Sequence, residues 1–156
     1  MTGGAASGRK GDRYEREFVN AVRKAGIGAL RAPSSGSATT TALPDVFVGE
    51  PITDASKELV TGWGLSRLWL VEHKAGDATT LYVDESEVEA LERAASTWGG
   101  TPLLGARFTT QASATHHYLV RPEDARRTSQ SFGLPEADVA DRAAVLVAAD
   151  GEVRRS

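Results

Sequence analysis

The sequence contains no cysteine, and this absence excludes a disulfide framework and a thiolate metal site. It also has no run near the roughly 18 apolar residues that a membrane-spanning helix needs. Residues 1–8 are mainly Gly, Ala and Ser and lack the apolar core of a secretory signal, so we expect a flexible tail there. These absences predict a cytoplasmic protein with no membrane partner.

What is present is ordinary for a globular chain. Of 156 residues, 40% are hydrophobic and 25% are charged, which is enough apolar material for one core. We therefore expect residues 9–156 to form a single domain.

Charge is unevenly distributed along the chain. The net charge is −3, but residues 1–35 hold seven Lys and Arg against three acidic residues, so that segment is +4 and the remainder is −7. Contact with phosphates needs a local basic surface rather than a basic average. A solvated helix face produces the same asymmetry, so charge alone does not identify a nucleic-acid surface.

The first half of the chain shows a helix followed by strands. Apolar residues recur at helical spacing over 12–25, and Gly26 is a natural stop. A short strand is expected at 28–32, a polar loop at 33–43 and a second strand at 45–48. Residues 49–64 lack periodicity and indicate an excursion between strands, with a hairpin insertion at 51–64.

The second half begins with an apolar strand at 67–74. A helix is expected from Asp84, with Glu87 as a capping partner, with Val88, Leu91, Ala95 and Trp98 as its inner stripe, and with Gly99-Gly100 at its end. Further strands are expected at 101–108 and 115–120. The segment from Pro122 is ambiguous and includes a possible helix near 136–149. The order helix, three strands, helix, strand, strand predicts an α/β fold with a central mixed sheet flanked by helices.

Three residues form the most informative constellation. Glu72 and Lys74 alternate on one strand and therefore share a face, whereas His73 points to the other side. Asp45 opens the preceding strand and is expected to bring its carboxylate beside Glu72. Two carboxylates with waters make a hard oxygen site for Mg²⁺, and Lys74 would supply a fixed positive charge to a phosphoryl transition state.

The pattern Pro44-Asp45, then Glu72-His73-Lys74, matches the PD-(D/E)-x-K nuclease signature. Chance alternation of a Glu and a Lys on an exposed strand is the alternative. The rest of the strand is apolar, however, and charges at the end of such a strand are costly unless they are solvated or used.

Glu15 has two interpretations on spacing alone. It shares the inward stripe of the first helix with Phe18 and Val22, which places it toward the sheet as a candidate metal ligand. Asp12 with Glu15 equally matches a capping box, which would be purely structural.

A longer set of motifs resembles a known family. The stretch 9–17 (RKGDRYERE), Gly26, and the stretch 31–37 (RAPSSGS) resemble the N-terminal block of the archaeal Holliday junction resolvases. The stretches 81–83 (LYV), 87–91 (EVEAL) and 99–108 (GGTPLLGARF) follow in the family's order. The resemblance covers about residues 9–121 and is more specific than the nuclease signature alone.

The resemblance implies a restriction-endonuclease-like core, a homodimer, and paired nicking of four-way DNA junctions with Mg²⁺ or Mn²⁺. It implies metal ligation by Glu15, Asp45 and Glu72, and adds Lys74 and Ser35 to these as catalytic residues. The basic and serine positions that it implies for DNA contact are Arg9, Lys10, Arg13, Arg16, Arg31, Ser34 and Ser37. Surface charges and a plain serine loop are the structural alternatives for Arg16, Arg31 and Ser35.

The sequence departs from the family in two places. The segment between Asp45 and Glu72 is longer by about a dozen residues, in a region that tolerates insertion. The second departure is in the second helix. There Ala94, Ala95 and Trp98 stand where the family tends to carry phenylalanines near the dimer contact.

Two rival functions stay open on the sequence: an endonuclease of the same fold acting on duplex, flap or single-stranded DNA, and a junction-binding protein without catalysis. His116 and His117 are adjacent on a strand and face opposite sides, so a structural or surface role is favoured over shared metal binding.

Overall fold

The computed structural model describes residues 3–33, 43–52, 65–110 and 116–156, with the backbone alone at 3–10, 51–52 and 65–66. The chain begins with a long helix and three strands, followed by a short strand and a second long helix. These elements are α1 (Gly3–Lys24), β1 (Gly28–Arg31), β2 (Val46–Ile52), β3 (Leu65–Gly76), β4 (Thr80–Asp84) and α3 (Glu85–Trp98).

The second half is mostly strand. Its elements are β5 (Thr101–Phe108), β6 (His116–Val120), the 3₁₀ turn η2 (Pro122–Asp124), β7 (Arg126–Arg127), β8 (Ser131–Pro135), α4 (Val139–Arg142), β9 (Ala143–Ala148) and β10 (Val153–Arg155). No helix in the described ranges is both long and apolar enough to cross a membrane.

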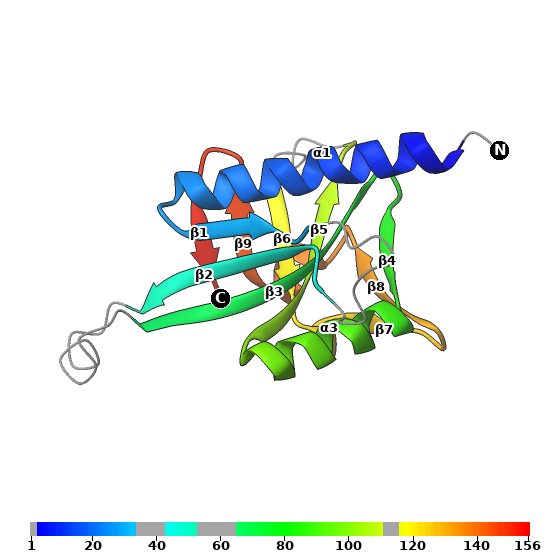
Figure 1. Ribbon diagram of the computed structural model, residues 1–156. Coiled ribbons are helices and arrows are strands. Elements are labelled where there is room, and N and C mark those ends of the chain that lie inside the picture. Colours follow the sequence, from blue (N-terminus) through cyan, green and yellow to red (C-terminus); the bar gives the residue numbers. More distant parts are fainter. Residues whose placement is uncertain (1–2, 34–42, 53–64, 111–115) are drawn as a thin grey trace.

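A seven-stranded mixed sheet organises the molecule, with the order β1-β2-β3-β5-β6-β9-β10. The pairing of β3 with β5 is parallel and the other pairings are antiparallel. Helix α1 lies across one face of this sheet. Helix α3 and the small sheet β4-β8-β7 cover the other face (Figure 1). The expected mixed sheet flanked by helices is confirmed.

The central strand β3 is buried on both faces, which explains its nearly continuous apolar sequence. Leu70 packs into the core on the α3 side, whereas Trp69 and Val71 pack into the core under α1. Phe18 and Val22, both fully buried, bring the apolar stripe of α1 onto the sheet. This alternation determines which face each polar residue at the end of β3 reaches.

Two expected boundaries in the first half were wrong. Helix α1 begins at Gly3 rather than Asp12, so residues 3–8, expected to be a tail, are helical. The Ala, Lys and Arg residues between 5 and 16 favour helix, whereas the glycines at 3, 4, 8 and 11 oppose it. The excursion expected from residue 49 is also shorter, because β2 continues to Ile52 in register with Leu65. Residues 53–64 lie outside the described ranges.

The second helix is confirmed, with one correction. The Asp84 amide donates to the Glu87 carboxylate at 2.9 Å, and Gly99 ends the helix in the left-handed region at φ 70°. Val88, Leu91 and Ala95 are buried as expected, but Trp98 is 53% exposed. Its ring forms a T-shaped pair with Phe47, with centroids 5.2 Å apart, and the rest of the side chain is open to solvent.

The C-terminal segment departs most from expectation. The helix expected near 136–149 is wrong, because only Val139–Arg142 is helical and Ala143–Ala148 forms strand β9. Strand β9 pairs with β6 and buries Val145 and Val147 against the sheet. Strand β4, absent from the expected order, precedes α3 and pairs with β8.

Candidate active site

Asp45 and Glu72 face each other across two antiparallel strands. The register pairs Val46 with Val71, and continuing it by one residue places Asp45, just before β2, opposite Glu72 on β3. Side chains at directly opposed positions lie on the same side of a sheet, about 5 Å apart at Cβ. The main-chain N–H of His73 donates to Asp45 Oδ2 at 2.8 Å and holds that carboxylate in place. The two acids therefore converge at one end of the sheet.

The electrostatics of this pair favour a shared proton. Burial, followed by the negative charge of Asp45, raises the pKa of Glu72 to about 8. Burial also raises the pKa of Asp45, although the His73 N–H bond acts in the opposite direction. The two carboxyl groups therefore influence each other's pKa. Close carboxyl groups with too little positive charge around them hold a proton that a cation can replace.

Lys74 lies on the same side of β3 as Glu72. Its Nζ is 2.7 Å from Glu87 Oε1 and 4.0 Å from Glu72 Oε1. Burial opposes the charge on Lys74, but the hydrogen bond and the charge of Glu87 outweigh it and raise the Lys74 pKa. Glu87 thus joins the N-terminus of α3 to the ammonium group.

Glu15 approaches the pair from α1. Burial first, and the charge of Asp45 second, raise the Glu15 pKa, so the two carboxylates are electrostatic neighbours. The guanidinium of Arg31 donates to Glu15 Oε2 at 3.0 Å and to Asp12 Oδ1 at 2.5 Å. Arg31 ends β1, where the Ala32 amide donates to the Asp45 carbonyl at 2.9 Å. Helix α1 and three strands therefore meet at this point.

The opposite side of β3 carries a buried polar network. His73 Nε2 lies 2.9 Å from Nδ1 of the fully buried His117, and the His73 ring stacks on Phe18. His117 Nε2 lies 3.0 Å from Glu17, which also accepts from Arg107 at 2.6 Å. Among the described residues, Nε2 of His117 has no hydrogen-bond partner of suitable geometry, so its contact with Glu17 is one of close approach. The structural role expected for His117 agrees with this network.

Of the residues expected in the site, the structure places Asp45, Glu72 and Lys74 together, while Glu15 is an electrostatic neighbour of Asp45 and is paired with Arg31. The capping-box interpretation of Asp12 with Glu15 is wrong, because both lie inside α1 and pair with Arg31. Among the expected DNA contacts, Arg13 and Arg16 are exposed on α1. Ser34, Ser35 and Ser37 lie outside the described residues, as do the side chains of Arg9 and Lys10.

Asp45 and Glu72 fit a hard divalent cation. Over the ranges that the structure describes, no three His, Asp or Glu side chains gather as a preformed metal cluster. Glu15, the expected third ligand, is paired with Arg31. Mg²⁺ is often held by one or two carboxylates with waters, and the raised pKa values of Asp45 and Glu72 show a pair short of positive charge.

Comparison with solved structures defines the fold. The chain is similar to the Holliday junction resolvase Hjc of Archaeoglobus fulgidus, with a TM-score of 0.64 at 22% sequence identity. The likeness covers 83% of this chain and 92% of that chain. The fold is restriction-endonuclease-like.

Comparison of sequences identifies the family. The model of the archaeal Holliday junction resolvase (Hjc) family matches residues 6–140, which is most of the chain. No curated protein sequence matches this chain. The chain belongs to the archaeal Holliday junction resolvase family and is an endonuclease that resolves four-way DNA junctions.

Sequence reasoning missed several residues around the site. Glu87 was recognised only as a capping partner, and its reach to Lys74 depends on how α3 packs against β3. Glu17, Arg107 and His117 come from three separate elements, and nothing in their local sequence pairs them. The one available signal was the position of Glu17 next to the buried Phe18 on α1.

Proposed function

We propose that the protein hydrolyses phosphodiester bonds at four-way junctions with Mg²⁺ held by Asp45 and Glu72, and that Mn²⁺ substitutes for it. The observation that supports this most is the cross-strand pair itself, in which the Glu72 pKa reaches about 8 beside Asp45. When bound, the ion would polarise the scissile phosphate and favour ionisation of the attacking water.

The chain's own residues supply the surroundings of that ion. Lys74, held at 2.7 Å by Glu87, places a positive charge where negative charge develops on the phosphoryl group. Glu15 becomes a third ligand when Arg31 releases it, and in the proposal Arg31 then turns to a DNA phosphate. The hydrogen bond from His73 N–H keeps Asp45 oriented toward Glu72.

The proposal includes DNA contacts and an assembly. Basic residues of the N-terminal segment and the serines of the 33–43 loop contact the junction backbone, with Ser35 in a catalytic role. The DNA-contact set is Arg9, Lys10, Arg13, Arg16, Arg31, Ser34 and Ser37. Two protomers form a homodimer that nicks opposite strands of branched DNA in pairs, in the cytoplasm.

The test is cleavage of an immobile four-way junction beside linear duplex and flap substrates of matched sequence. We expect Mg²⁺-dependent nicking of the junction and little cutting of duplex. Glu72→Ala should abolish nicking while junction binding persists, because binding depends on phosphate contacts outside the carboxylate pair. The exposed Glu89 on α3 provides a matched control, since Glu89→Ala removes one carboxylate far less buried than Glu72.

Equal cutting of duplex and junction would favour the broader endonuclease of the same fold. Junction binding without cleavage in either Mg²⁺ or Mn²⁺ would favour the non-catalytic alternative.

A further inference from the structure

The solvent-facing side of helix α1 carries polar residues at helical spacing. Arg16, Asn20 and Arg23 follow one another at i, i+4 and i+7, so they lie on one face, and all three are exposed. Together with Val19 and Arg31 they line a pocket of about 270 Å³ between α1 and the end of β1. The lining of the pocket is therefore mostly polar, with Val19 as its apolar residue.

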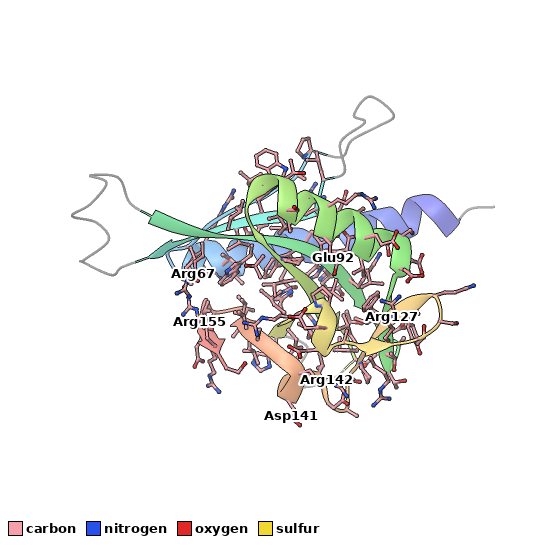
Figure 2. The ribbon with its side chains drawn as sticks, turned by 90° about the horizontal axis from the view of Figure 1, so that it is seen from below. Arg67, Glu92, Arg127, Asp141, Arg142 and Arg155 are labelled. Carbon is pink, nitrogen blue, oxygen red and sulfur yellow. The ribbon has the colours of Figure 1, made fainter. Side chains whose placement is uncertain are left out.

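The charge of this pocket is of one sign. Three guanidinium groups line it, and among the residues that the structure describes no carboxylate does. Two other pockets contain acidic residues. One, between α3 and β8, is lined by Glu92 and Arg127, which Figure 2 labels. The other, near β10, is lined by Glu50 and Arg155. On the far side of Arg31, Asp12 and Glu15 offset part of its charge. The free positive charge of the pocket comes chiefly from Arg16 and Arg23.

Arg23 is oriented by the fold before any ligand binds. Its Nε donates to the Ala29 carbonyl of β1 at 2.9 Å. That contact uses one of the five N–H donors of the guanidinium and leaves four on the Nη atoms. A planar fork held at one corner loses little freedom when it binds an anion with two oxygens. The chemistry of the site thus suits a phosphate.

The pocket adjoins the carboxylate cluster through a shared residue. Arg31 forms part of its wall and also donates to Glu15 at 3.0 Å, and Glu15 neighbours Asp45. Arg23 follows Glu15 by eight residues on α1, which is about 12 Å along the helix axis at a rise of about 1.5 Å per residue. Since the strand rise is about 3.4 Å per nucleotide, this span corresponds to a few nucleotides of DNA.

We propose that this pocket binds a second backbone phosphate of the strand that is cut, a few nucleotides from the scissile bond. Asn20 and Arg23 are the residues that this site adds to the DNA contacts proposed above, and the inference rests on that proposed function. Its role is to set the register of the strand, so that the scissile phosphate reaches Asp45 and Glu72.

The test measures junction binding by the full-length protein over a range of salt concentrations, in EDTA so that no cleavage occurs. Arg23→Gln should weaken binding about fivefold to tenfold near 0.1 M salt and reduce the slope of log K against log salt by about 1. The control is Arg126→Gln, which removes an exposed arginine of β7 across the sheet from α1 and should change neither quantity.

A second arm identifies the phosphate. Junctions carrying one neutral methylphosphonate linkage at successive positions near the cut are bound to the wild type and to Arg23→Gln. At one position the neutral linkage should weaken wild-type binding about as much as Arg23→Gln does, and should cost the variant nothing further. Additive losses at every position, or an unchanged salt slope in Arg23→Gln, would overturn the proposal.

Because Arg23 also contacts Ala29, Asn20→Asp provides an independent variant that leaves this bond intact. A carboxylate in the pocket should repel the phosphate and weaken junction binding at least as much as Arg23→Gln. Wild-type affinity from Asn20→Asp would equally contradict the inference. Cleavage by the wild type is scored separately, so an inactive wild type would reject the proposed function without deciding whether this pocket binds phosphate.

Discussion

At the scale of single residues, the carboxyl pair makes a prediction about stability. The folded pKa of Glu72 is about 8 and its ordinary value is 4.5, so folding favours the protonated form. The contribution of Glu72 to the free energy of unfolding is therefore fully present below pH 4.5 and is lost as pH rises toward about 8. In EDTA at pH 9, Glu72→Gln should raise the free energy of unfolding by on the order of 3 kcal/mol.

Chemical unfolding of the wild type and Glu72→Gln between pH 5 and 9 measures this effect. The gap between them should widen with pH and narrow again when Mg²⁺ is added, because the ion stabilises only the wild type. Glu92→Gln, on the exposed face of α3, should follow the wild type throughout. A gap independent of pH would show that Glu72 does not carry the shifted pKa.

The residues of the site were predictable to the extent that local patterns determine them. Alternation along β3 places Glu72 and Lys74 on one face and His73 on the other, and the structure agrees. The pairing of Glu15 with Arg31 was not predictable, because it depends on where β1 ends relative to α1. Glu87 reaches Lys74 through tertiary packing, which no spacing rule reveals.

At the scale of elements, α1 is anchored to the sheet by Glu17. The nearby His117, with a further contribution from Arg107, lowers the Glu17 pKa to about 2. A depressed carboxyl pKa stabilises the fold above pH 4.5, and this stability is lost as pH falls toward about 2. Glu17→Gln should cost about 1–2 kcal/mol at pH 7, less than the full shift because the carboxylate is partly solvated.

Urea unfolding of the wild type and Glu17→Gln at pH 7 and pH 3 checks this prediction. The difference between the two proteins should shrink at the lower pH. A difference of equal size at both pH values would mean that the charge on Glu17 contributes nothing to the anchoring of α1.

Helix α3 ends at Gly99, in a backbone conformation that only glycine adopts easily. Gly99 has φ 70°, so Gly99→Ala should cost about 1 kcal/mol and lower Tm by about 2–4 °C. Gly49 in β2 is the control, because it lacks a positive φ and a Cβ there would meet nothing within 4 Å. Thermal unfolding should separate the two variants, and equal Tm values would remove the conformational argument.

Element prediction succeeded where periodicity was long and failed where runs were short. Helix α3 and strand β5 were located almost to the residue. The segment that became β9 is a short Ala/Val run, and such a run is compatible with a buried strand or a helix until its neighbours are known. Pairing with β6 supplies that information, and it comes from residues more than twenty positions away.

At the scale of the whole molecule, the proposed dimer predicts paired cutting. A supercoiled plasmid with an extruded cruciform should become linear in one binding event, because two active sites act on one junction. Mixed dimers of wild type and Glu72→Gln should instead release nicked circles. Sedimentation should show a mass near twice 16.5 kDa. A monomer that produces only nicked circles would contradict the dimer.

The account depends centrally on Asp45 and Glu72 exchanging a shared proton for a divalent ion. Titration calorimetry with Mn²⁺ at pH 7, repeated in buffers of different ionisation enthalpy, measures ion binding and proton release together. The wild type should bind an ion with release of about one proton, and Asp45→Asn should bind far more weakly and release none. Equal affinity in the two proteins, or binding by the wild type without proton release, would contradict the account.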